Sequence, residues 1–141
     1  GKDQKKDADA KFALAKDLYG QGAFDEALEL YYQAVELYTQ VGGHDCISVA
    51  NTYNNMGMVY GSQGHYERAL EYYQQSLDIK IKVVGHDHTS VAMSYGNMGY
   101  VYRSLGKAEE AREMFTKTYS IFLKVLGPDH PHTQQAKSDV D

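Results

Sequence analysis

Apolar side chains recur every three or four residues along most of this chain, which is the period of an α-helix with one buried face. The spacing is clearest at Val49, Tyr53, Met56 and Tyr60, and a second run over residues 66–84 continues it. No segment alternates apolar and polar residues as a half-buried strand does. The pattern therefore predicts an all-α protein.

The helical pattern itself repeats every 42 residues. Gly43-His44-Asp45 returns as Gly85-His86-Asp87, and Asn55-Met56-Gly57 returns as Asn97-Met98-Gly99. A fixed period of this size is typical of a solenoid, in which each unit buries its apolar face on its neighbours. We expect one domain with repeats at about 2–43, 44–85 and 86–127, and a partial repeat or cap over 128–141.

Each repeat is expected to hold two helices, A and B, separated by a tight turn. A glycine follows each predicted A and B helix closely, and glycine is the usual residue just past a helix end. The predicted A helices span 7–19, 47–62 and 89–104, the predicted B helices span 24–40, 66–84 and 107–126, and a short capping helix spans 132–138.

Two glycines, Gly57 and Gly99, fall inside predicted A helices. An interior glycine costs about 1 kcal/mol relative to alanine, so its presence needs a reason. We expect helix B to approach closely at these points, through the small residues Ala69 and Ala111.

The composition narrows the classes of partner. The net charge is −5, and no basic run exceeds two residues, so nucleic acid is not an expected partner. No apolar run approaches the ~18 residues of a membrane span, and the charged start of the chain does not resemble a signal peptide. Cys46 is the only cysteine, which rules out an internal disulfide and fits a reducing compartment. We expect a cytoplasmic protein; the leading glycine suggests a trimmed chain.

Candidate chemistry is sparse. Cys46 has no Lys or Arg within five residues that would activate its thiol. The pairs His86/His88 and His130/His132 recur at the links between repeats, which favours a role in the links over metal binding. No phosphate-binding glycine loop, catalytic carboxylate pair or Ser/His/Asp set is evident. We therefore expect no enzyme activity, no catalytic residue, no metal and no cofactor.

Residues 54–69 and 125–131 carry a resemblance to a known family. They read NNMGMVYGSQGHYERA and VLGPDHP, and both resemble the tetratricopeptide repeat in its 42-residue, kinesin light chain-like form. The resemblance implies a right-handed α-solenoid of three helix-turn-helix repeats with a short C-terminal capping helix. It also implies a scaffold or adaptor whose A helices line a concave groove that binds a short peptide segment of a partner protein.

The resemblance further assigns groove positions by register. Asn55 and Asn97 match the subfamily's groove asparagine, whose amide can donate to and accept from a peptide backbone. Lys80 matches a basic groove position, and Arg103 could bind a ligand carboxylate, so an acidic segment is one possible partner. The alternative is that these polar residues are ordinary solvated surface. The full predicted set is Asn51, Asn54, Asn55, Met58, Lys80, Met93, Asn97, Tyr100 and Arg103.

Two other interpretations stay open from the sequence. The close similarity of the second and third repeats would allow the ends of the array to stack between chains, which would make this a self-associating structural module. It would equally fit an engineered or trimmed repeat chain without an evolved ligand.

Overall fold

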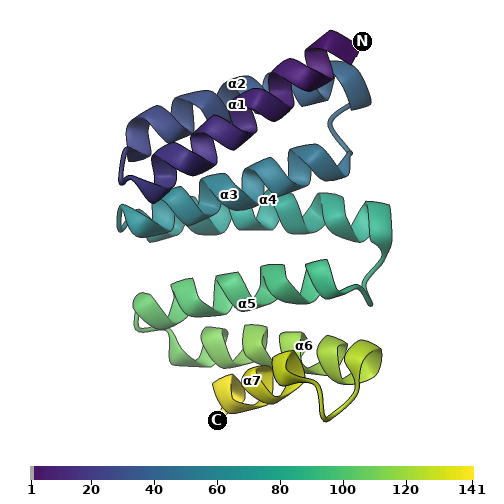
Figure 1. Cartoon of the computed structure of the whole chain (residues 1–141). Coiled ribbons are helices and arrows are strands. Elements are labelled where there is room, and N and C mark those ends of the chain that lie inside the picture. The colour runs from purple at the N-terminus through teal and green to yellow at the C-terminus, as the bar shows by residue number, and fades with distance from the viewer. Residues whose placement is uncertain (1) are drawn as a thin grey trace. The chain divides into compact units, whose positions relative to one another are not determined.

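The computed structural model describes residues 2–141, and within this range it holds α-helices and no strand (Figure 1). The helices are α1 (Lys2–Gly20), α2 (Phe24–Gly42), α3 (Ile47–Ser62), α4 (Tyr66–Val84), α5 (Thr89–Ser104), α6 (Ala108–Leu126) and α7 (Pro131–Val140).

The all-α prediction is confirmed, and α3, α4 and α5 begin and end where the periodicity placed them. The largest difference is at α1, which begins at Lys2 and not at residue 7. Ion pairs one helical turn apart explain the extension: Lys5 lies 3.5 Å from Asp9, and Lys11 lies 3.4 Å from Asp7. Such i,i+4 pairs stabilise a helix that has little apolar surface to bury.

The chain divides into two compact units, and the boundary between Ile79 and Lys80 lies within α4. The first unit contains α1, α2, α3 and most of α4; its core includes Tyr38, Val49 and Ile79, all at most 6% exposed. The second unit contains the end of α4 with α5, α6 and α7, and it buries its own set of apolar side chains. These are chiefly Val91, Ala92, Met98, Phe115, Ile121, Phe122 and Ala136.

Every connection between helices contains a glycine with positive φ, and these glycines stand at every twenty-first residue. Gly43 shows the reason: its φ is 80°, and its amide donates to the carbonyl of Thr39 at 2.8 Å, which ends α2. A side chain would strain this left-handed conformation. The full set is Gly22, Gly43, Gly64, Gly85, Gly106 and Gly127.

The two interior glycines face a different partner from the one predicted. A Cβ on Gly57 would lie 2.8 Å from the ring of Tyr73, and a Cβ on Gly99 would lie 2.7 Å from the ring of Phe115. The expected close approach of helix B is therefore present, but the contact is an aromatic ring and not Ala69 or Ala111. The reason is size, because the ring occupies the space that a methyl group on the glycine would fill.

A buried hydrogen bond also recurs between helix B and helix A. The Ser76 hydroxyl donates to the carbonyl of Ala50 at 2.7 Å in the first unit, and the Thr118 hydroxyl donates to the carbonyl of Ala92 at 3.1 Å in the second. Both hydroxyl groups thus find partners inside the protein. The repeat therefore preserves a polar contact as well as an apolar one.

None of the helices in residues 2–141 combines the length and the apolar character that a membrane span requires.

Candidate binding site

The predicted site residues of the first unit lie along α3. Asn51 and Met58 are exposed, whereas Asn54 and Asn55 are half-buried. The Asn55 amide donates to the hydroxyl of Tyr31 at 3.3 Å, so part of its hydrogen-bonding capacity is already used inside the unit. A ligand on α3 would therefore meet two exposed side chains and two amides that already make internal hydrogen bonds.

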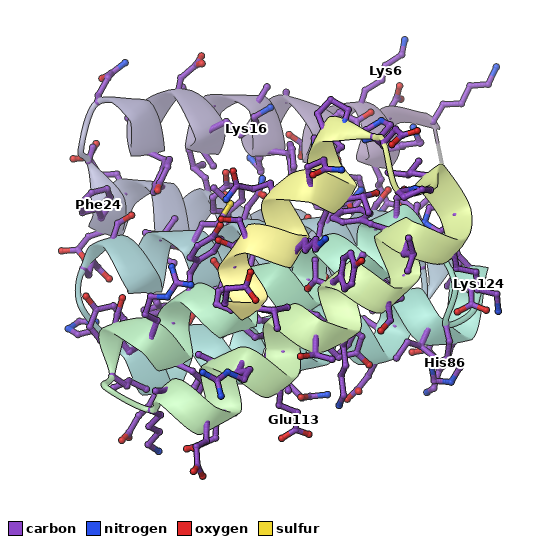
Figure 2. All side chains as sticks on the ribbon, turned by 90° about the horizontal axis from the view of Figure 1, so that it is seen from below. Lys6, Lys16, Phe24, His86, Glu113 and Lys124 are labelled. Atoms are coloured by element: carbon purple, nitrogen blue, oxygen red, sulfur yellow. The ribbon has the colours of Figure 1, made fainter. Side chains whose placement is uncertain are left out.

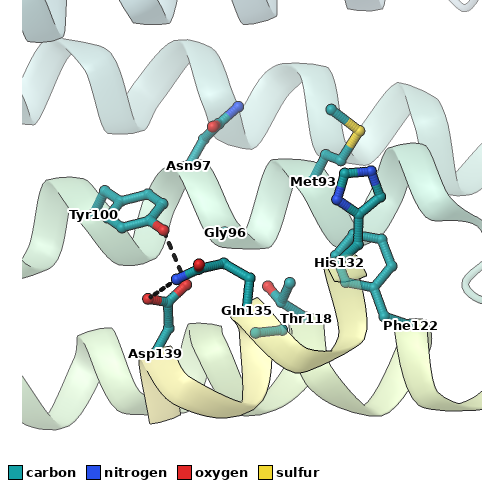
Figure 3. A pocket seen from close by; sticks show the side chains of 10 residues that line it. Met93, Gly96, Asn97, Tyr100, Thr118, Phe122, His132, Gln135 and Asp139 are labelled. Carbon is teal, nitrogen blue, oxygen red and sulfur yellow. Dashed lines mark hydrogen bonds between the residues drawn. The ribbon is translucent and has the colours of Figure 1, made fainter. Parts of the chain in front are cut away.

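The predicted residues of the second unit gather around a pocket of about 180 Å³ (Figure 3). Met93, Asn97 and Tyr100 line it from α5, and Gly96 lies between them without a side chain. The remaining walls come from α6 and α7. They are formed by Thr118, Phe122, His132, Gln135, Ala136 and Asp139.

The base of this pocket is apolar and well packed. Phe122 is 7% exposed, and its ring stacks on His132 with 5.7 Å between centroids and 26° between planes. A Cβ on Gly96 would meet the Thr118 hydroxyl at an ordinary 3.6 Å, so this glycine keeps space open without being sterically required. The Met93 side chain is 61% exposed at the edge. An apolar group of a ligand would find a preformed surface here.

A carboxylate from α7 forms the polar side of the pocket. Asp139 accepts a hydrogen bond from the Tyr100 hydroxyl at 2.9 Å and one from the Gln135 amide at 3.2 Å (Figure 3). Burial raises the pKa of Tyr100, and the hydrogen bond to Asp139 and the charge of Asp139 raise it further. The phenol therefore stays protonated and serves as the donor.

Arg103 meets the same carboxylate group but lines a neighbouring pocket of about 150 Å³. Its guanidinium lies over the ring of Phe115, 4.7 Å from the centroid, and donates to the backbone carbonyl of Asp139 at 3.4 Å. The distance to the Asp139 carboxylate is 4.0 Å. The predicted ligand-binding arginine thus already has an internal carboxylate beside it.

Lys80 does not present its ammonium at the surface, in contrast to the expectation of a basic groove position. It is 5% exposed, and its Nζ donates to the Ser94 hydroxyl at 3.0 Å and to the Ser90 carbonyl at 3.4 Å. Desolvation lowers its pKa. The physical reason is the small Ser94 opposite it, which leaves room for the lysine to lie inside the second unit.

The residues of α7 were missed as site residues, although the sequence holds a signal for them. Moving Met93 and Asn97 forward by one 42-residue period leads to Gln135 and Asp139. Residues 128–141 were predicted to be a partial repeat or cap, but no groove position was assigned within them. The structure shows that α7 lines the pocket with α5, as an A helix of a further repeat would do.

The family comparison agrees with this geometry. A family model described as tetratricopeptide repeat matches residues 7–82, 69–124 and 90–136, which together cover most of the chain. The chain belongs to the tetratricopeptide repeat family. Its fold is similar to that of kinesin light chain-like repeats.

Solved structures resemble the whole tetratricopeptide array. BtubC (BKLC) from P. vanneervenii aligns with a TM-score of 0.86 and 25% identity, over 94% of this chain and 53% of that one. A putative kinesin light chain with nearly identical TPR-like repeats from Podosopora anserina aligns with a TM-score of 0.79 and 22% identity, over 94% and 63%. The N-terminal domain of stress-induced protein-1 from C. elegans aligns with a TM-score of 0.73 and 18% identity, over 98% of both chains.

The chain thus spans about half to two thirds of the first two structures. No curated protein matched the chain. Tetratricopeptide repeats generally mediate interactions between proteins and are generally non-enzymatic scaffolds.

Two of the link histidines of this tetratricopeptide chain, His88 and His130, act as helix caps. Nδ1 of His88 accepts the backbone N–H of Ser90 at 3.0 Å at the start of α5, and Nδ1 of His130 accepts that of His132 at 3.0 Å at the start of α7. Cys46 stands at the matching position before α3, and its side chain makes no such bond. Within residues 2–141, no three His, Cys, Asp or Glu side chains form a group that could hold a metal.

The first unit also contains a tyrosine cluster, formed by Tyr32, Tyr60 and Tyr72. The hydroxyl of Tyr32 lies 2.6 Å from that of Tyr60 and 3.0 Å from that of Tyr72. Tyr60 and Tyr72 stack with 5.4 Å between centroids, and the guanidinium of Arg68 lies 5.4 Å from the Tyr60 ring. Burial acts to raise the pKa of Tyr32, but its hydrogen bonds with the other two phenols and with Arg68, together with the charge of Arg68, outweigh burial and lower the pKa. The Tyr32 hydroxyl thus joins two stacked tyrosines and uses the hydrogen-bonding capacity of the cluster internally.

Proposed function

We propose that this chain is a protein-binding module that holds a short, extended segment of a partner protein against α5 and α7. The observation that carries the proposal is the pocket of the second unit. Three of the residues assigned by register, Met93, Asn97 and Tyr100, converge there with four further side chains from α7. A preformed concave site with an apolar base and a few polar groups is the usual form of a ligand site.

The polar side chains that line the pocket favour a peptide as the ligand. Asn97 and Gln135 carry amides, which can donate to one backbone group of a segment and accept from another. The apolar base formed by Phe122 and Ala136 would bind one side chain of the segment. Affinity in the micromolar range is expected, since ordering a flexible segment offsets much of the contact energy.

The α3 residues form part of the same proposal within the first unit. Asn51 and Met58 are exposed there and would contact a segment bound to the first unit itself, with Asn54 and Asn55 beside them. Lys80 is left out, because its ammonium is buried. Arg103 and Lys80 suggested an acidic segment as one candidate ligand, but each of the two side chains already makes an internal contact. A cytoplasmic location stays a prediction.

The proposal can be tested by selecting peptides from a random 12-residue phage-displayed library on the purified chain. The enriched peptide, labelled with tryptophan, should bind saturably and should shift the backbone NMR signals of Asn97, Tyr100 and Gln135. The variant Gly96→Leu would fill the pocket and should abolish binding. Thr116→Leu, on the exposed side of α6, is the matched control and should bind normally.

The outcome that contradicts the proposal is equally specific. Either no peptide is enriched, or the enriched peptide shifts signals elsewhere and binds Gly96→Leu as well as it binds the unmodified chain. Circular dichroism of both leucine variants would confirm that they are folded.

A second function, self-association, has one observation in its favour. Leu14 on α1 is 51% exposed, whereas its repeat counterparts Met56 and Met98 are 0% and 4% exposed. A second copy of the chain could cover this leucine. Light scattering should then show a mass that rises with concentration, and Leu14→Glu should remove the rise. A constant monomer mass would reject self-association and leave peptide binding unaffected.

A further inference from the structure

We propose that Asp139 gives the pocket of the second unit a preference for a cationic side chain, lysine or arginine, in the bound segment. This inference rests on the proposed peptide-binding function and specifies its ligand. Asp139 stands at the repeat position that Asn55 and Asn97 occupy in the preceding repeats. At this one position, a neutral amide is replaced by a negative charge.

Asp139 is the only Asp, Glu, Lys or Arg among the residues that line the pocket. Its side chain is 13% exposed, so its charge is partly shielded from water and acts on a ligand more strongly than a surface charge would. A carboxylate has about four acceptor positions. The hydrogen bonds from Tyr100 and Gln135 use two of them, which leaves capacity for a donor from a ligand.

Arg103 does not occupy the remaining acceptor positions of the Asp139 carboxylate. Its guanidinium packs on the ring of Phe115 and lines the neighbouring pocket. Its 4.0 Å separation from the Asp139 carboxylate exceeds a hydrogen-bond distance. Arg103 does, however, use the nearby backbone carbonyl, so an anionic ligand would meet an arginine that is already engaged and a carboxylate that repels it.

The shape of the pocket matches a side chain with an apolar stem and a charged end. Met93, Phe122 and Ala136 offer apolar surface, and Asp139 lies beside Tyr100 at the polar side (Figure 3). Lysine and arginine pack their methylene stems on apolar surface while the charged end reaches a polar partner. The volume of about 180 Å³ far exceeds the ~10–15 Å³ that one water needs, so a long side chain can enter.

The last turn of α7 adds to this preference. Asp139 is one residue from the helix end at Val140. Carbonyl groups at a helix C-terminus carry partial negative charge and favour nearby cations. The helix and the carboxylate therefore select for the same sign of charge.

The test is a selection from the random 12-residue phage-displayed library on the unmodified chain and on Asp139→Asn. The substitution keeps the shape and the acceptor for Tyr100 while it removes the charge. The unmodified chain should enrich peptides with one recurrent Lys or Arg, and Asp139→Asn should lose that residue from its consensus. Glu113→Gln is the matched control: it removes one negative charge from an exposed side chain of α6 that projects away from the ribbon, and the consensus should not change (Figure 2).

A titration makes the result quantitative. A tryptophan-labelled copy of the enriched peptide should bind the unmodified chain about tenfold more tightly than its Lys→Gln analogue. That difference should shrink to less than twofold on Asp139→Asn and remain on Glu113→Gln.

The possible failures are distinguishable. If no peptide is enriched on any variant, the proposed function is wrong and this inference falls with it. If peptides are enriched but their consensus is acidic, or is the same on Asp139→Asn, peptide binding stands and the cationic preference is wrong.

Discussion

In the first unit, the hydroxyl of Tyr32 bonds to those of Tyr60 and Tyr72, whereas in the second unit α5, α6 and α7 leave a pocket open. The internal frame of the two units is nevertheless the same. Each has a glycine on helix A against an aromatic ring of helix B, and each has a buried hydroxyl of helix B bonded to a carbonyl of helix A. The comparison teaches that the repeat fixes the contacts between helices and leaves the surface free to differ.

The largest effect is expected from breaking the shared frame. Gly57→Leu would force a side chain into the ring of Tyr73 and should lower the free energy of unfolding by on the order of 3 kcal/mol through overpacking. Urea denaturation followed by circular dichroism would measure the change. Gly61→Ala, one turn further along α3, is the control: its Cβ would meet Ala69 at 3.9 Å, and the helix should gain up to about 1 kcal/mol. Equal stability of Gly57→Leu and the unmodified chain would disprove the tight contact.

A smaller loss of stability is expected when the tyrosine cluster of the first unit is disrupted, and almost none at the matching positions of the second unit. Tyr32→Phe removes the hydroxyl that joins Tyr60 and Tyr72 and should cost about 1–2 kcal/mol, because two hydrogen bonds are lost. Tyr102→Phe makes the same change at the repeat position of Tyr60, where Gln74 and Met114 replace the other two tyrosines. We expect a change within about 0.5 kcal/mol there. Similar losses in both variants, measured by urea denaturation, would mean that the cluster has no special stability.

The helix caps offer the next comparison. His88→Ala should lower stability by about 1 kcal/mol by removing the cap of α5, while His88→Asp should retain most of it. Cys46→Asp should raise stability by a similar amount, because α3 has no side-chain cap in the native sequence. Thermal unfolding of the three variants would show whether each substitution raises or lowers the melting temperature. A stabilising effect of His88→Ala would contradict the capping role.

The smallest expected effect is on the loss of folding stability at acidic pH. The hydroxyl of Tyr38 donates to Asp9, and this hydrogen bond holds the pKa of Asp9 below its usual value of about 3.9. A carboxyl group with a lowered pKa stabilises the folded state above the unfolded-state value and loses that contribution as the pH falls through the folded-state pKa. Tyr38→Phe should therefore raise the pKa of Asp9 in an NMR titration and make the acid-side loss of stability shallower. An unchanged Asp9 titration would refute this coupling.

The helices were predictable from sequence because two signals coincide. The 3–4 spacing of apolar residues gives each helix, and a glycine such as Gly64 or Gly85 marks its end. The site was predictable only in part. Repeat register identifies which face of α5 a residue occupies, and Met93, Asn97 and Tyr100 do line one pocket; their role in binding stays a prediction.

Repeat register does not show how deeply a side chain is buried or which side chains it contacts. This explains the wrong prediction for Lys80 and the missed contacts of Gly57 and Gly99. Lys80 occupies the same repeat position as Tyr38 and Phe122, and all three side chains are buried. From the sequence alone, a lysine is expected to be exposed at the surface. Asp139 escaped notice because only a fragment of its repeat is present, so its match to Asn97 has little surrounding sequence to support it. The aromatic partners of Gly57 and Gly99 depend on three-dimensional packing, which spacing alone does not specify.

The glycines at every twenty-first residue restrict how the length of such a chain can change. One residue inserted into a helix rotates all later side chains by about 100°, since an α-helix has 3.6 residues per turn. The aromatic ring of helix B would then miss the glycine of helix A. Losing a single helix with its glycine would exchange the places of A and B in everything that follows. Single-residue insertions and deletions should therefore be tolerated at the turns and not inside the helices. Over evolutionary time the array should grow or shrink by whole duplications and losses of a 42-residue repeat, each of which leaves its neighbours in phase.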